Sequence, residues 1–218
     1  MGLFNIAGTG GDGNMRAGVH TRKIVNPSWG TKLTGTTGKM TFGLLSASDE
    51  TPEDIGGRGE AVAGRSKLFT IGRATYGLKE SDYIGALVVD TEHAGRFNRV
   101  IGSDLSLRFT RRQQMSATVL SSRTGVSGEP QKDGVAAQAS YNFSDRKYLF
   151  LWQVEHYDKE FQMDTGFYNR TGFTAGWAYT AVNFYPKDTS KAWLKRAFPF
   201  FWTKQGRDLI QDGRDRFY

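Results

Sequence analysis

Residues 134–157 read GVAAQASYNFSDRKYLFLWQVEHY, and the alternation of side chains in this stretch decides the fold class. From Val135 to Phe143 every second residue is apolar, and the residues between them are mostly polar. The apolar set then takes the even positions from Tyr148 to Val154. A period of two is typical of a β-strand with one apolar and one polar face. The stretch therefore predicts a β-hairpin.

The turn of this hairpin sets which residues face each other. A two-residue turn at Asp145 and Arg146 would pair Tyr141 with Phe150 and would place both apolar sets on one face. The run 101–110 alternates in the same way. Amphipathic strands therefore recur along the chain.

The composition favours a membrane barrel over a soluble sandwich. The chain has 218 residues, of which 38% are apolar, 13% are aromatic and 27 are glycine. Two facing soluble sheets would need more aliphatic core residues, whereas a membrane barrel needs only a thin apolar coat. No stretch approaches the roughly 20 apolar residues of a membrane helix. Any membrane role must therefore depend on strands.

The order of strands and turns indicates a meander. Tight turns strictly alternate in the sequence with long polar segments, among them EHAGRFN at 92–98, as they do in outer-membrane barrels. We expect an all-β, antiparallel up-and-down meander of about 10–12 strands, which is a membrane β-barrel or a large part of one. A flexible glycine-rich segment, 1–14, would precede a single barrel domain, 15–218, that is truncated at both ends. The candidate strands are 16–24, 30–36, 39–47, 67–78, 82–91, 98–110, 113–123, 134–144, 147–157, 173–186 and 193–203.

Each strand of such a barrel has a lumen side and a lipid side. The polar positions predict a lumen lined by Asp104, Ser106, Arg108, Ser116, Thr118, Gln138, Ser140, Asn142, Gln153 and Glu155. The apolar positions predict a lipid-facing set of Leu105, Leu107, Phe109, Val119, Tyr141, Phe143, Tyr148, Phe150 and Trp152. A solvated sheet face is the alternative interpretation of the polar set.

Charge and motifs exclude several functions. The net charge of +7 is scattered along the chain without a nucleic-acid signature, so we expect no nucleic-acid partner. The GTGGDG of 8–13 matches a dinucleotide pattern, but the residues that follow disfavour the required helix. The histidines have no metal-site spacing, and cysteine is absent. We therefore expect no metal, no cofactor and no catalytic residue.

Three segments carry a resemblance to a known family. An Arg22-Lys23-Ile24 turn precedes a Gly-x-Lys-x-Thr-Gly strand at 30–35, and a later segment leads from Glu160-Phe161 through Gly166-Phe167 to Arg170. These segments resemble the C-terminal barrel of a bacterial family of unknown function. Its full-length members begin with a signal peptide and a family 9 carbohydrate-binding-like module. We expect no signal peptide here, because MGLFNIAGTGG lacks a basic start and a long apolar run, and the resemblance does not extend to the carbohydrate-binding-like module.

The resemblance and the alternation together give one leading hypothesis and two alternatives. The leading hypothesis is a bacterial outer-membrane β-barrel domain that serves as a pore, an anchor or a surface-binding platform and is not itself catalytic. Its partners would be outer-membrane lipid and a glycan or envelope protein. The first alternative is a soluble antiparallel carbohydrate-binding domain. The second is an outer-membrane barrel hydrolase, which would need Ser and His on neighbouring strands facing alike; His156, on the apolar face, gives this little support.

Overall fold

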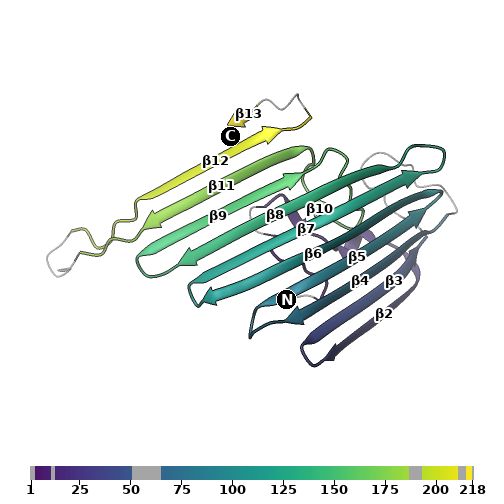
Figure 1. The fold of residues 1–218 in the computed structure, drawn as a ribbon, viewed down its shortest axis with the longest axis horizontal. Helices are drawn as coiled ribbons and strands as arrows, with labels where there is room; N and C mark the ends of the chain where they lie inside the picture. The colour runs from purple at the N-terminus through teal and green to yellow at the C-terminus, as the bar shows by residue number, and fades with distance from the viewer. Residues whose placement is uncertain (1–2, 11–12, 51–64, 187–192, 211–214, 218) are drawn as a thin grey trace.

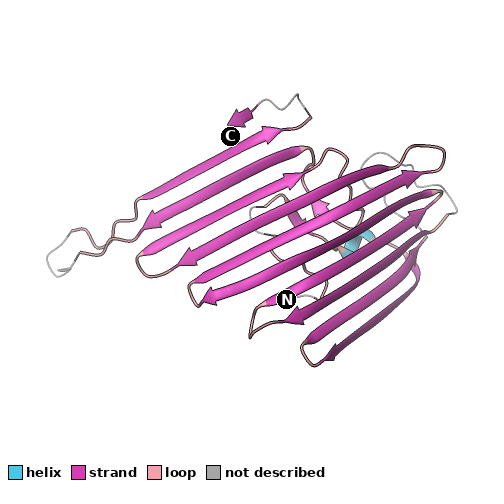
Figure 2. Ribbon diagram, in the orientation of Figure 1, coloured by secondary structure: helices cyan, strands magenta, loops and turns pink. Residues whose placement is uncertain are grey.

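Eleven antiparallel strands form one sheet in the computed structural model, which describes residues 3–10, 13–50, 65–186, 193–210 and 215–217 (Figures 1 and 2). Within these residues, each strand pairs with the next one along the chain, apart from the short strands β1 and β10. The predicted all-β up-and-down meander is therefore confirmed. The strands of the sheet are β2 (Pro27–Thr37), β3 (Met40–Asp49), β4 (Lys67–Gly77), β5 (Tyr83–His93), β6 (Arg96–Thr110), β7 (Gln113–Val126), β8 (Lys132–Ser144), β9 (Tyr148–Tyr157), β11 (Phe173–Val182), β12 (Phe200–Asp208) and β13 (Asp215–Phe217).

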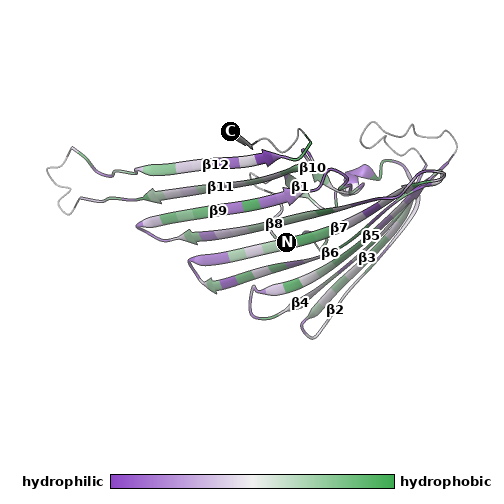
Figure 3. Cartoon of the chain, turned by 45° about the horizontal axis from the view of Figure 1, so that its top comes forward, coloured by the Kyte–Doolittle hydropathy of each residue, from purple (hydrophilic) through white to green (hydrophobic). Residues whose placement is uncertain are grey.

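The sheet is curved and open (Figure 3). Its edge strands are β2 and β13, which do not pair with each other over the residues that the structure describes. Closure into a barrel is therefore not seen and stays a prediction.

Two chain segments lie against one side of the sheet, here called the inner face, and appear behind the strands in Figure 1. The first is the N-terminal segment, described over residues 3–10 and 13–20, and the second is the 158–172 loop. A short pairing of β1 (Met15–Ala17) with β10 (Phe167–Tyr168) joins them, and the 3-10 helix η1 (Thr21–Lys23) follows the first segment. The opposite side of the sheet is called the outer face.

The hydrophobic core lies between the inner face and these two segments. The N-terminal segment contributes Ile6, which is 2% exposed, and Met15, which is 1% exposed. Burial of such side chains is the main favourable term in packing the segment onto the sheet. The core residues are Phe4, Ile6, Met15, Ile71, Leu87, Val89, Val100, Leu120, Ala136, Tyr157, Phe161, Met163, Phe173 and Ala175.

The glycine-rich N-terminal segment is packed over its described residues rather than free. Glycine permits close approach here, and the flexibility expected of 1–14 stays a prediction. Gly8 and Gly10 have positive φ angles of 72° and 95°, which other residues adopt at a cost. On the strand side, a Cβ on Gly134 would overlap the backbone of Phe161 in the 158–172 loop. Small residues on both partners therefore let the inner face be covered.

The register of the hairpin at 134–157 differs from the predicted one by two residues. Tyr141 pairs with Trp152 rather than with Phe150, although both apolar sets do share the outer face. The cause is the turn, because the carboxylate of Asp145 accepts the backbone N–H groups of Lys147 and Tyr148, each at 2.7 Å. The turn therefore moves forward by one residue along the chain.

Three further predictions are corrected by the structure. Strands β5 and β6 are joined by a tight turn at Ala94 and Gly95 rather than by a long connection, so short and long connections do not strictly alternate. Both residues have positive φ, which a two-residue hairpin turn favours. The predicted strand 16–24 is instead β1 and η1 on the inner face, and the predicted strand 193–203 lies at 200–208.

Candidate functional surfaces on the two faces of the sheet

The outer face carries an apolar band across the middle of the strands. The apolar residues named below are at least 38% exposed, so no other described part of the chain covers them, whereas Tyr141, Phe143 and Trp152 on the same face are half-buried. Strand pairing places them on the same side of the sheet. In Figure 3 hydrophobic (green) and hydrophilic (purple) segments both occur along several of the strands. The band includes Leu33, Leu44, Ile84, Val88, Ile101, Val119, Val135, Phe150 and Val154.

A row of charges bounds this band towards the end of the strands that carries the 158–172 loop. Asp90 pairs with Arg99, Arg99 with Arg123, and Arg123 with Asp133, so the four residues cross β5 to β8 at one level. The Arg123 Nε atom is 2.7 Å from an Asp133 oxygen, and Arg99 Nη2 is 2.9 Å from Glu92. These side chains are exposed on the outer face. The outer face therefore changes from apolar to charged over a single level.

On the band side of this row, at the pairing level of Ala137 and Val119, a hydroxyl, an imidazole and a carboxylate form a hydrogen-bonded chain on the outer face. His156 of β9 and Thr174 of β11 pair directly across the strands. The His156 Nδ1 atom is 2.6 Å from Thr174 Oγ1, and His156 Nε2 is 3.0 Å from Asp158 Oδ1. The second oxygen of Asp158 accepts the backbone N–H of Val135 at 2.9 Å. This set lies on the outer face, and sequence reasoning considered only His156 of the three, as weak support for a hydrolase.

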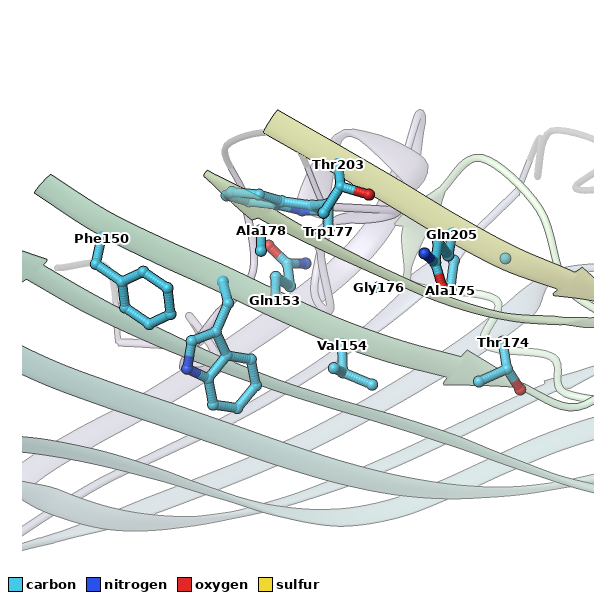
Figure 4. Close-up of a pocket in the computed structure, with 12 residues that line it drawn as sticks. Phe150, Gln153, Val154, Thr174, Ala175, Gly176, Trp177, Ala178, Thr203 and Gln205 are labelled. Carbon is cyan, nitrogen blue, oxygen red and sulfur yellow. The ribbon is translucent and has the colours of Figure 1, made fainter. Parts of the chain in front are cut away.

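A depression of about 710 Å³ adjoins this set over β9, β11 and β12 (Figure 4). Gly176 and Ala178 leave room there because their side chains are small. Figure 4 shows Phe150, Val154 and Thr174 projecting to the same side of the sheet. The lining residues are Phe150, Trp152, Gln153, Val154, Thr174, Ala175, Gly176, Trp177, Ala178, Thr203, Gln205 and Gly206.

On the inner face, polar side chains hold the backbone of the N-terminal segment. Asp104 accepts two hydrogen bonds from Arg73 and a third from the Ala7 N–H at 2.8 Å. The Ala7 carbonyl accepts from Thr118 at 2.7 Å and from Gln138 at 3.3 Å. These bonds satisfy groups that burial would otherwise penalise. The segment is therefore fixed by specific polar contacts as well as by apolar packing.

Asp164 fixes the 158–172 loop to the same face. Its buried carboxylate is 2.7 Å from Lys67 Nζ and 2.7 Å from Arg96 Nη1, and Thr91 donates to it at 3.1 Å. Burial opposes ionisation, but the hydrogen bond from Arg96 and the charges of Lys67 and Arg96 outweigh it and lower the pKa of Asp164 to about 2. The carboxylate is therefore ionised and paired. Sequence reasoning did not single out these three residues, because they are 29 to 97 positions apart.

The predicted lumen residues all lie on the inner face. Seven of them are buried, namely Asp104, Ser106, Ser116, Thr118, Gln138, Gln153 and Glu155. Ser140 is half-buried, and Arg108 and Asn142 are exposed near the opposite rim. The N-terminal segment thus covers part of this set, and Glu155 accepts the Asn14 N–H at 2.9 Å. Their role as lumen lining stays a prediction.

The predicted lipid-facing residues project from the outer face, apart from Phe109 at a bulge between Arg108 and Thr110. Leu105, Leu107, Val119, Tyr141, Phe143, Tyr148, Phe150 and Trp152 share that face by strand pairing. Tyr141 and Phe150 have ring centroids 6.2 Å apart. Whether lipid covers them stays a prediction.

Strand β12 departs from the alternation. Its inward residues Phe200 and Trp202 are 65% and 51% exposed, and its outward Phe201 is 62% exposed. The Phe200 ring stacks on Tyr179 with centroids 5.7 Å apart. Large exposed apolar surfaces usually mark contact sites, so both faces of β12 are candidates for contact with another chain segment or molecule.

Comparison with known proteins did not identify a family for this chain. Family models, curated proteins and solved structures gave no match to the chain. Among the described residues, no cluster of three or more histidine, aspartate or glutamate side chains could hold a metal ion. The same part of the chain has no helix long and apolar enough to cross a membrane.

Proposed function

We propose that this sheet forms part of the wall of a β-barrel in a bacterial outer membrane, with its outer face against lipid. The observation that supports this proposal best is the exposed apolar band ending at the charge row of Asp90, Arg99, Arg123 and Asp133. Outer-membrane barrels carry an apolar belt bounded by interfacial residues. A soluble protein rarely leaves so continuous an apolar surface uncovered.

The dimensions of the band suit a bilayer. On β8, the outward residues from Val135 to Phe143 span eight residue steps, which is roughly 26 Å along the strand at about 3.3 Å per residue. The segment contains nine residues, and a transmembrane β-strand tilted by about 45° needs about 9–11 residues to cross the hydrocarbon layer. The charge row would then lie at the level of the lipid headgroups.

The packed inner face favours an anchor over an open pore. The N-terminal segment and the 158–172 loop lie where an aqueous channel would run, and both are held by buried polar contacts. A barrel whose interior is filled by its own chain can hold a domain or partner at the membrane without conducting solutes. We therefore favour the anchor among the three passive roles.

The free edges place a further requirement on this function. Unpaired backbone groups are not tolerated in hydrocarbon, so β2, β13 and the part of β12 outside its pairing with β13 would need partner strands there. The rings exposed on both sides of β12 are consistent with an additional covering element.

One pair of substitutions tests the lipid-facing assignment. Val119 is 53% exposed in the middle of the band, and Asn142 is exposed on the inner face. Val119→Arg should destabilise folding into phospholipid vesicles by roughly 2–4 kcal/mol, whereas Asn142→Arg should change it by less than about 1 kcal/mol. Urea titration of vesicle-folded protein measures both values.

The result that contradicts the proposal is equally specific. An exposed valine on a soluble sheet usually tolerates arginine within about 0.5 kcal/mol. Equal effects of the two substitutions, together with a folded chain in detergent-free buffer and no vesicle association, would leave the soluble carbohydrate-binding alternative.

A further inference from the structure

We infer that Thr174, His156 and Asp158 form a hydrolytic site for acyl esters on the outer face of the sheet. The inference goes beyond the proposed anchor and stands on hydrogen-bond geometry that the anchor does not require. Of these three residues, sequence reasoning weighed only His156, and Thr174 and Asp158 come from the structure.

The three side chains stand in the order that nucleophilic ester hydrolysis needs. Thr174 Oγ1 lies 2.6 Å from one imidazole nitrogen of His156, and the other nitrogen lies 3.0 Å from Asp158. If the Nε2–H of His156 donates to Asp158, Nδ1 is left to accept the hydroxyl proton of Thr174. Many unrelated hydrolases use a hydroxyl activated by an imidazole that a carboxylate orients; here the two ring nitrogens have exchanged partners relative to the Ser-His-Asp triad.

The fold fixes each member of this site. His156 and Thr174 pair directly on neighbouring strands and project from the same face. Asp158 follows the end of β9, and its second oxygen accepts the Val135 N–H at 2.9 Å, which restricts its rotation. Two of the members therefore come from rigid strands, and the third is held by a backbone contact.

Donors for the developing oxyanion come from the next strand. Arg207 of β12 pairs with Thr174, and Gln205 pairs with Gly176, so both project from the same face as the hydroxyl. Gln205 and Thr174 also line the same depression. Side-chain N–H groups beside a nucleophile can stabilise a tetrahedral intermediate.

The depression beside Thr174 indicates the substrate class. Phe150, Trp152 and Val154 supply its apolar wall, and its volume is about 710 Å³. Small-molecule sites usually have volumes of about 300–1,000 Å³ with mostly apolar linings. A long acyl chain could lie along these rings with its ester carbonyl at Thr174. The site therefore fits a long-chain carboxylic ester, such as that of a lipid.

The chemical steps balance with water as the second reactant. The Thr174 oxygen attacks the ester carbonyl while its proton passes to His156, and the leaving alcohol then takes that proton. Water attacks the resulting acyl-threonine and gives one proton to His156, which returns it to the Thr174 oxygen. The products are one carboxylic acid and one alcohol, and the side chains return to their starting state. Thr174 and His156 are the catalytic residues, and Asp158 is a positioning residue.

The first test uses the full chain in detergent with p-nitrophenyl laurate as substrate and p-nitrophenyl acetate as the short-chain comparison. We expect hydrolysis, with a higher kcat/KM for laurate. Thr174→Val should lower kcat by at least about 100-fold, because it removes the nucleophile and keeps the side-chain shape. Thr180→Val is the matched control, since Thr180 projects from the same face of β11 without a histidine partner. It should leave the rate unchanged.

A second measurement separates catalysis from folding. A fluorophosphonate probe should add covalently to Thr174 in the wild-type chain, as located by peptide mass spectrometry, and should not label Thr174→Val. Asp158→Asn should slow this labelling, and Asp158→Glu should restore part of it. Absence of ester hydrolysis and labelling in the folded wild-type chain overturns the inference. So does a Thr174→Val variant as active as Thr180→Val.

Discussion

The inner and outer faces of this sheet are built from the same alternating strands, yet the charged groups compared here are buried on the inner face and exposed on the outer face. On the inner face, Asp104 and Asp164 are buried and saturated with hydrogen-bond donors. On the outer face, Arg99 and Arg123 are exposed and paired at one level. The inner face is therefore covered by segments of the same chain, whereas no described part of the chain covers the outer apolar band.

The largest expected effect comes from removing one buried charge on the inner face. Asp164→Asn leaves Lys67 and Arg96 facing a neutral amide, and their side chains are only 5% and 22% exposed. Loss of one partner of a buried pair costs about 3–5 kcal/mol. Chemical denaturation should show a loss of this size. Neutralising the exposed Arg123 by Arg123→Gln should have a much smaller effect, and equal losses would remove the distinction between the faces.

Adding a methyl group should also change stability differently on the two faces. Gly134→Ala places a methyl group against the backbone of Phe161 on the inner face, so the 158–172 loop must shift at a cost of up to about 3 kcal/mol. Gly72→Ala on the outer face meets nothing within 4 Å and should be neutral or slightly stabilising. The midpoints of thermal unfolding of the two variants measure the difference. A loss of stability in Gly72→Ala equal to that in Gly134→Ala would show that the outer band is covered by protein.

Lowering the pH from about 4 towards 2 should weaken the contacts of Asp164 on the inner face. The pKa of Asp164 is lowered from 3.8 to about 2, so its ionised form is favoured by folding. The stabilisation is therefore present above about pH 4 and is lost as the pH falls towards 2, with a total of about 2 kcal/mol. Denaturant midpoints across this range measure it. Asp164→Asn should lack this component, and an unchanged acid dependence in that variant would assign the effect to another group.

The sequence was sufficient for the fold class and for the side on which most strand residues lie. Alternation from Val135 to Phe143 is a local property, so it separates two faces without knowledge of tertiary contacts. The register of the 134–157 hairpin could not be predicted from alternation alone, because the hydrogen bonds of the Asp145 carboxylate place the turn one residue further along the chain. The His156–Thr174 pair was also missed, because the signal for it was the pairing of β9 with β11 rather than any motif in the chain.

By itself, the sequence determined that this chain forms amphipathic strands in a meander, because side chains two residues apart on a strand share a face. Only the tertiary structure decided which groups meet across that sheet. It placed Ala7 against Asp104, Asp164 between Lys67 and Arg96, and His156 between Thr174 and Asp158. Most of these contacts join residues 18 to 97 positions apart, and they depend on curvature, register and close packing that no local pattern specifies.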